Sequence, residues 1–169
     1  MPYSVTNTRS VPQAGLEARA LISGNDHSMS MNSNDRQRLA TSWLLLQKTP
    51  EAGATREDLA WVVEKVWDLC DYAPNDAFEF ILAVLERDIS SPTLAILSAG
   101  PLESLLRKHG PRIIGRVERR ARRDANFTKL LSHVWKDAMS SKIWARVECI
   151  RERQWARHFT AESEDLTIS

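Results

Sequence analysis

Apolar residues of this 169-residue chain recur with helical spacing from about residue 35 to residue 157. They return every three or four positions, which places them on one side of a helix with about 3.6 residues per turn. No segment alternates apolar and polar residues as a half-buried strand would, and no Asn-Gly or Asp-Gly hairpin turn occurs. We therefore predict an all-α fold of seven to eight short helices, stacked in antiparallel, solenoid-like (HEAT-like) pairs.

Four helices are predicted in the first part of the chain, over residues 35–48, 55–72, 76–87 and 91–97. Asn34 and Asn75 are the expected caps of the first and third, and Thr55 opens the second. The expected core stripe of the second helix consists of Leu59, Val62, Val63, Val66, Leu69 and Cys70. The third helix is apolar on two sides, which predicts a place in the middle of the domain.

Residues 99–127 contain the clearest signals for the starts and ends of helices. Gly100-Pro101 is expected to open one helix, and Gly110-Pro111 to end it and open another. The second of these helices has a buried arc formed by Ile113, Ile114, Val117 and Ala121. Its opposite side carries an arginine stripe of Arg112, Arg116, Arg119, Arg120 and Arg123. This stripe is either a solvated face or a surface that contacts a partner.

Two more helices are predicted after Asn126. The first is lined by Phe127, Leu130, Leu131 and Val134, with Trp135 beside them, and the second runs from Ser141 to about Arg157 and buries Ile143, Val147 and Ile150. On the last helix, Trp144, Arg151 and Trp155 fall on one line beside the buried stripe. An arginine over an indole face gains about 0.5–1 kcal/mol at an exposed site. The cluster therefore either seals the domain edge or anchors a partner.

Composition divides the chain into three parts. Residues 1–33 are rich in Ser, Asn, Thr and Gly and are predicted to form a flexible leader. Residues 34–158 form the helical domain, and residues 159–169 an acidic flexible tail. The leader places Asp26 beside His27, but a metal or catalytic site needs a rigid scaffold that this segment lacks.

The formal net charge of +1 hides two oppositely charged segments. Residues 51–88 contain ten acidic and three basic residues, a net charge of −7, and residues 107–123 contain eight basic residues and one acid, a net charge of +7. Such a charge dipole can steer a partner or bring copies of the chain together. It indicates nucleic-acid binding less strongly than a uniformly basic domain would.

Motifs that carry chemistry are absent from the sequence. No phosphate-binding glycine loop, zinc-protease motif, serine-hydrolase motif or cysteine pair at ligand spacing occurs, so we expect no cofactor and no metal. The four histidines are scattered, and His133 with Asp137 has the spacing of an ordinary surface pair. A catalytic set of Glu103, His109 and Glu118 would require these three to converge, and otherwise Glu118 is expected in a partly buried ion pair.

The location of the protein is inferred from what the sequence lacks. No apolar run approaches the roughly 18 residues of a membrane span, and the first 30 residues contain no secretory signal core. Cys70 and Cys149 are 79 positions apart and make neither a disulfide framework nor a zinc site. These features predict a cytoplasmic protein with no membrane contact.

One family resemblance rests on a series of short matches along the chain. They are Ala99-Gly100-Pro101-Leu102-Glu103, His109-Gly110, Val117-Glu118, Ala121, Asp124, Phe127, Leu130-Leu131, Val134-Trp135 and Ile143-Trp144. In this pattern the chain resembles a family of small bacterial domains of unknown function, over residues 37–155 and most densely over 99–146. The resemblance implies a bacterial, helical, intracellular domain and brings no activity, cofactor or catalytic residue.

The function expected from the sequence is a non-enzymatic helical module that binds another protein, for instance as an immunity or regulatory partner. The expected binding residues are the arginine stripe together with Trp144, Arg151 and Trp155. One alternative is nucleic-acid binding through residues 112–123, and another is an enzyme with a Glu/His site. The sequence leaves the identity of the partner and the oligomeric state open.

Overall fold

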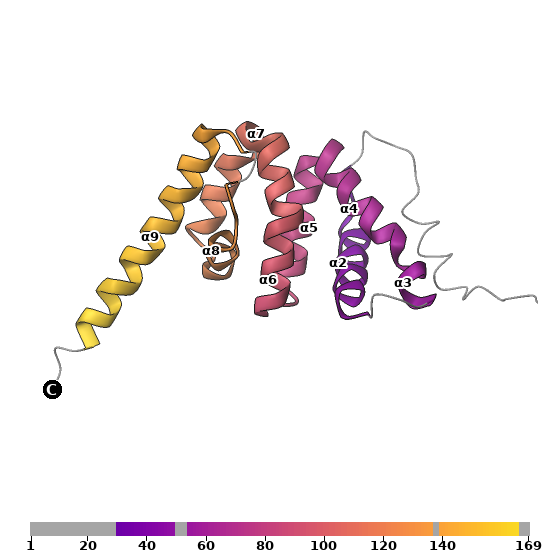
Figure 1. Ribbon diagram of the computed structural model, residues 1–169, viewed down its shortest axis with the longest axis horizontal. Coiled ribbons are helices and arrows are strands. Elements are labelled where there is room, and N and C mark those ends of the chain that lie inside the picture. Colours follow the sequence, from indigo (N-terminus) through magenta and orange to yellow (C-terminus); the bar gives the residue numbers. More distant parts are fainter. Residues whose placement is uncertain (1–29, 50–53, 137–138, 166–169) are drawn as a thin grey trace, which may run out of the picture.

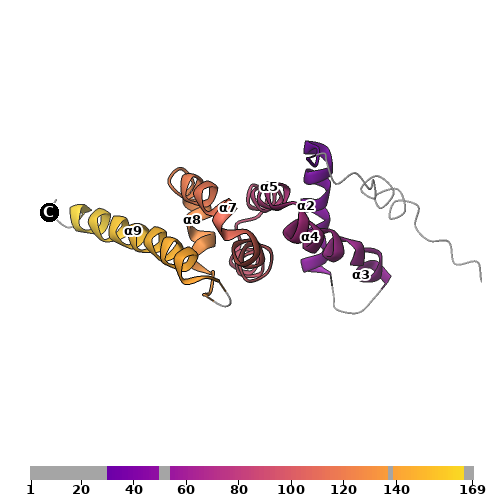
Figure 2. The same ribbon diagram turned by 90° about the horizontal axis from the view of Figure 1, so that it is seen from above.

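The computed structural model describes residues 30–49, 54–136 and 139–165, with the side chains of residues 54–55 and 154–165 outside that description. The described residues form helices and no strands, which confirms the all-α prediction. The helices follow one another along an elongated molecule, with α2–α4 (residues 33–72) at one end and α9 (Ser141–Asp165) at the other (Figures 1 and 2). Residues 1–29 of the predicted leader (residues 1–33) lie outside the described residues, whereas Ser33 begins α2 and Ser30 and Met31 donate hydrogen bonds to Asp76.

Helix α2 (Ser33–Lys48) begins two residues earlier than expected. Its cap is Asn32 and not Asn34, because the Asn32 side chain accepts a hydrogen bond of 2.9 Å from the backbone N–H of Asp35. An Asn at the cap satisfies one of the backbone N–H groups that the first turn leaves without a partner. Leu39, Ala40, Trp43 and Leu46 are buried along its inner side.

The predicted helix over 55–72 is divided into α3 (Ala54–Asp58) and α4 (Ala60–Tyr72), with the break at Leu59. The expected core stripe is correct at Val62, Val66, Leu69 and Cys70. It is wrong at Val63, whose side chain is 43% exposed, while Trp61 packs partly buried against the core. The inner side of α4 is thus turned toward Trp61 relative to the prediction.

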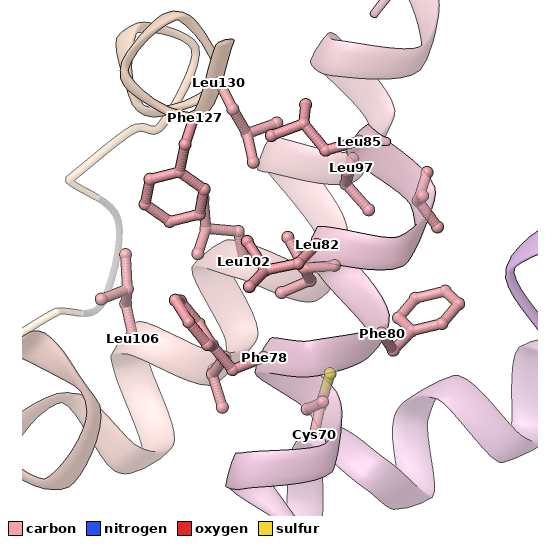
Figure 3. Close-up of a cluster of buried hydrophobic side chains, with 14 of the residues drawn as sticks. Cys70, Phe78, Phe80, Leu82, Leu85, Leu97, Leu102, Leu106, Phe127 and Leu130 are labelled. Carbon is pink, nitrogen blue, oxygen red and sulfur yellow. The ribbon is translucent and has the colours of Figure 1, made fainter. Parts of the chain in front are cut away.

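Helix α5 (Pro74–Leu85) is the central element, as its two apolar sides predict. It packs against α2, α4, α7 and α8, and all its residues from Phe78 to Leu85 except Glu79 are buried. Pro74 starts the helix, so Asn75 lies inside its first turn and is not the cap. Figure 3 shows Phe78 with Leu102, Leu106 and Phe127 in the core; the Phe78 and Phe127 rings meet edge to face with centroids 5.7 Å apart.

Helix α6 (Ser91–Leu97) ends where expected and continues into a π-helical turn, η1 (Ser98–Leu102), and then into α7 (Glu103–Ala121). Pro101 therefore does not open a new helix but lies inside this turn. Proline has no N–H to donate and its ring crowds the carbonyl four residues earlier, so a wider turn suits it. The buried hydroxyl of Ser98 lies 2.7 Å from Leu94 O and 2.8 Å from Leu130 O, which ties the turn to α8, the second helix after it in the chain.

The two helices predicted over residues 101–123 form one element that is kinked at His109 (φ −126°, ψ 19°). The expected break at Gly110-Pro111 is thus present as a kink. The predicted buried arc is confirmed, because Ile113, Ile114, Val117 and Ala121 are all at most 5% exposed.

Helix α8 (Ala125–Ser132) is shorter than predicted, so Val134 and Trp135 lie beyond its end. Asp124 caps it by accepting hydrogen bonds from the N–H groups of Asn126 and Phe127. Helix α9 (Ser141–Asp165) packs against α7 and α8 through the predicted Ile143 and Val147. It extends past Arg157, so residues 159–165 of the expected tail are helical.

Candidate functional site

A groove of about 980 Å³ lies between α9 and the segment that follows α8. It is lined by Ala95, Ala99, Ser132, His133, Val134, Trp135, Lys136, Trp144, Glu148, Arg151 and Glu152. We call it the tryptophan groove. The two alanines come from α6 and η1, and their small side chains leave the space that the larger residues surround.

The segment Val134–Lys136 is held from both sides. The backbone N–H of Trp135 donates a hydrogen bond of 2.7 Å to Oε1 of Glu103, and the guanidinium of Arg151 donates one of 3.3 Å to the carbonyl of Val134. Val134 itself is buried, while the Trp135 side chain is 74% exposed. The chain therefore fixes the backbone of Trp135 and leaves its indole ring in solvent.

Helix α9 supplies the opposite wall. The guanidinium carbon of Arg151 lies 5.6 Å from the centre of the Trp144 ring, so the predicted contact between these two residues is present. Trp155 belongs to the part of α9 whose side chains lie outside the described residues. Glu148 and Glu152 line the same wall, both exposed and without an ion pair to any described residue.

Sequence reasoning missed Trp135, Glu148 and Glu152. A signal for the two glutamates was available, because residues four and seven or eight positions after Trp144 return to its side of the helix. Trp135 could not be placed in the same way, since it lies outside any helix and its neighbours are set by Glu103, which is 32 positions away.

The arginine stripe is divided into two kinds of residue. Arg112, Arg119 and Arg123 are exposed and form no ion pair with a described residue, whereas Arg116 and Arg120 are half-buried and paired. A second hollow of about 510 Å³, which we call the arginine groove, is lined by Phe78, Glu79, Leu82, Arg116, Arg119, Arg120, Arg123 and Asp124. Two carboxylates thus stand among its four guanidiniums.

Arg116 joins α7 to α5, which belongs to the acidic segment of residues 51–88. Its guanidinium lies 2.5 Å from Oε1 of Glu79 and 3.0 Å from Oδ1 of Asn75, and it stacks 4.8 Å from the centre of the Phe78 ring. Arg36 of α2 lies 4.0 Å from the same Glu79 carboxylate. Arg120 is paired one turn along with Asp124, at 2.6 and 2.8 Å. Arg116 thus links α7 to α5, whereas Arg120 pairs locally with the residue that caps α8.

Glu103, His109 and Glu118 do not form a site. Glu103 accepts from Trp135, the His109 Nε2 lies 3.0 Å from the carbonyl of Asp71, and Glu118 is bound by Arg146 at 2.6 and 2.7 Å. No hydrogen bond between described residues joins any two of the three. Glu118 and Arg146 thus form the partly buried ion pair that the sequence predicts for Glu118. The hydrogen bonds from Arg146 lower the pKa of Glu118.

Both cysteines are free thiols; Cys70 is buried, and Cys149 on α9 is exposed. His133 lies 3.0 Å from the Lys129 carbonyl, and its predicted neighbour Asp137 lies outside the described residues, as do Asp26 and His27. Within the described part of the chain, no three His, Cys, Asp or Glu side chains are placed to hold a metal ion. No helix in that part is both long and apolar enough to cross a membrane.

Comparison with known proteins yields one match. The model of a family of unknown function (DUF6869) covers residues 49–155, a range that includes α3–α8, both grooves and the described side chains of α9. No curated protein and no solved structure matches the chain.

Proposed function

This chain belongs to the DUF6869 family of unknown function, and we propose from its surface that it is a non-enzymatic helical module that binds another protein through the tryptophan groove. The observation that carries the proposal is the 74% exposed Trp135 at the edge of a groove of about 980 Å³. Large exposed apolar side chains beside a concave surface are typical of binding sites.

The energetic argument starts from the indole ring. An aromatic side chain buries about 150–250 Å² when it is covered, and each Å² of apolar surface removed from water contributes roughly 25 cal/mol. Covering the exposed part of Trp135 would thus contribute on the order of 3 kcal/mol before the entropy of association is subtracted. This is the size of a binding hot spot, a class in which tryptophan and arginine are enriched.

Preorganisation supports the same conclusion. Glu103 and Arg151 fix the backbone on either side of the Trp135 peptide, so a partner does not have to order this segment when it binds. A site whose backbone is already in place loses less entropy on association than a mobile one. Trp144 is likewise held in place by Arg151.

The charges of the groove indicate the chemistry of the partner. Arg151 is engaged by the Val134 carbonyl and the Trp144 ring, and the carboxylates of Glu148 and Glu152 form no ion pair with a described residue, although Lys136 also lines the groove. A complementary segment would carry an apolar or aromatic side chain for Trp135 and one or more Lys or Arg side chains for the glutamates. We propose a protein segment of this composition as the occupant.

The engagement of Glu103, His109 and Glu118 by separate partners supports a binding role over an enzyme. The free thiols and the absence of a membrane-spanning helix from the described residues are compatible with the predicted cytoplasmic location. A bacterial origin, a role as an immunity or regulatory partner and solenoid-like pairing of the helices belong to the same proposal. They rest on the sequence pattern alone.

A specific test selects ligands from a displayed library of random peptides with the wild-type protein. We expect the enriched peptides to combine an aromatic or large apolar residue with Lys or Arg. Trp135→Ala should weaken their binding about 30-fold, since a hot-spot tryptophan contributes 2 kcal/mol or more. Leu45→Ala, which removes a 52% exposed apolar side chain on α2, is the matched control and should bind as the wild type does.

Two results would overturn the proposal. One is that the wild type enriches no peptide over the Trp135→Ala variant. The other is that the enriched peptides bind Trp135→Ala and wild type with equal affinity, which would place their site elsewhere on the protein.

A further inference from the structure

Helix α4 presents two partly exposed apolar side chains on one side. Val63 and Trp67, one turn apart, are 43% and 42% exposed. Four exposed acidic residues lie on the same two neighbouring helices, Glu57 and Asp58 on α3 and Glu64 and Asp68 on α4, and none of the four forms an ion pair with a described residue. We call this the acidic face. It lies at the end of the molecule opposite α9 (Figures 1 and 2).

The second half of α7 presents the opposite charge. Arg112, Arg119, Arg122 and Arg123 are exposed and form no ion pair with a described residue. Arg119 and Arg123 are one turn apart and stand on the wall of the arginine groove, whose floor includes Phe78 and Leu82. Arg119 and Arg123 in the arginine groove thus offer two cations without an ion pair, and Glu64 and Asp68 on α4 offer two anions without one.

We propose that the acidic face of one copy docks head to tail into the arginine groove of a second copy. Trp67 would lie against the guanidiniums of Arg119 and Arg123, and Glu64 and Asp68 would neutralise them. The face of an indole ring attracts a guanidinium electrostatically, and the attraction is stronger when the contact excludes water. Because each copy keeps one acidic face and one arginine groove free, the contact is heterologous and can repeat.

Charge balance favours a second copy over a polyanion as the occupant. Glu79 and Asp124 stand among the arginines, so a continuous phosphate backbone along the stripe would meet both carboxylates, whereas Glu64 and Asp68 would need to approach only Arg119 and Arg123. The protein as a whole has a formal charge of only +1, with oppositely charged segments of equal size. This distribution allows the negative segment of one copy to attract the positive segment of another.

Sedimentation velocity of the full-length chain tests the proposal. The wild type should associate at about 100 µM protein and about 50 mM salt and become monomeric near 500 mM, because exposed charges are screened within a few ångströms at high salt. The double variants Arg119→Glu/Arg123→Glu and Glu64→Arg/Asp68→Arg should each be monomeric at low salt. An equimolar mixture of the two should associate again, since each then offers the other an opposite charge.

The matched control is Lys129→Glu/Lys142→Glu, which gives the same net charge as the arginine variant through two exposed lysines on α8 and α9. It should associate as the wild type does. Circular dichroism melts show whether each variant is folded. The milder Trp67→Ala and Arg119→Gln/Arg123→Gln changes should also weaken association, and they leave the test valid if a charge reversal impairs folding.

Three outcomes would overturn the proposal. They are a wild type that is monomeric at low salt, association that persists in both charge-reversed variants, and a mixture of the variants that stays monomeric. If the wild type were monomeric and bound duplex DNA, and the Arg119→Gln/Arg123→Gln variant did not bind it, the arginine groove would be a nucleic-acid-binding site instead. Peptide capture by Trp135 is independent of these results, so the two proposals can fail separately.

Discussion

Gly110 on α7 is packed so closely against Ile143 on α9 that a Cβ atom on Gly110 would lie 2.7 Å from Cγ1 of Ile143. This glycine is therefore required by the approach of two helices. Ile143 is buried and branched at Cβ, so its side chain has little freedom to move away. The contact fixes where α9, and with it the wall of the tryptophan groove, meets the body of the protein.

Gly110→Ala should destabilise the protein by about 1–3 kcal/mol, the usual cost of overpacking a core. Gly100→Ala is the control, because a Cβ at Gly100 would meet nothing within 4 Å, and it should change stability little. Ile143→Ala should relieve the clash, so the double variant should lose less than the sum of the single changes. Chemical denaturation of the four proteins measures these differences, and an additive result would contradict the assigned contact.

The arginine stripe should be energetically uneven. Arg116→Gln removes the ion pair with Glu79, the hydrogen bond to Asn75 and the stacking on Phe78, and we expect a loss of about 1–2 kcal/mol. Arg119→Gln on the same helix removes no ion pair and should stay within about 0.5 kcal/mol of the wild type. Equal free energies of unfolding for the two variants would show that Arg116 has no structural role.

The Glu118–Arg146 pair makes a prediction for pH. Because the pKa of Glu118 is lower in the folded protein than its ordinary value of 4.5, the pair stabilises the fold above that pH. The contribution is lost as the pH falls through the lowered pKa. Glu118→Gln should therefore be less stable than the wild type at pH 7, and the difference should shrink in acid. A difference that grew on acidification would have the wrong sign.

The two thiols should differ in reactivity. Burial, followed by the nearby Asp71 carboxylate, raises the pKa of Cys70 to about 12, so this thiol stays protonated at neutral pH. Cys149 is exposed, and the thiolate is the reactive form of cysteine. A maleimide reagent should label Cys149 in the native protein at pH 7.5 and label both residues in denaturant. Mass spectrometry of digested peptides distinguishes them, with Cys149→Ser as the control that should show no native labelling.

The tryptophan groove combines contacts within one helix with contacts between segments that are far apart in the sequence. Trp144 and Arg151 could be paired from the sequence because seven positions are about two turns of a helix, and such residues meet through local geometry alone. Trp135 joins them only because α8 ends at Ser132 and Glu103 holds the next segment from another helix. Helical periodicity contains no information about that contact.

Periodicity alone determined the helical class, the central position of α5 and the buried arc of α7, because burial of an apolar side follows from spacing within one helix. Only the tertiary structure decided which residues of other helices contact the sides of α4 and α7 that carry Val63 and Arg116. Val63 is exposed although it belongs to an apolar pattern, and Arg116 is neutralised by Glu79, 37 positions away. The physical reason is that spacing fixes directions around a helix axis, whereas ion pairs, caps and grooves depend on the distances between helices.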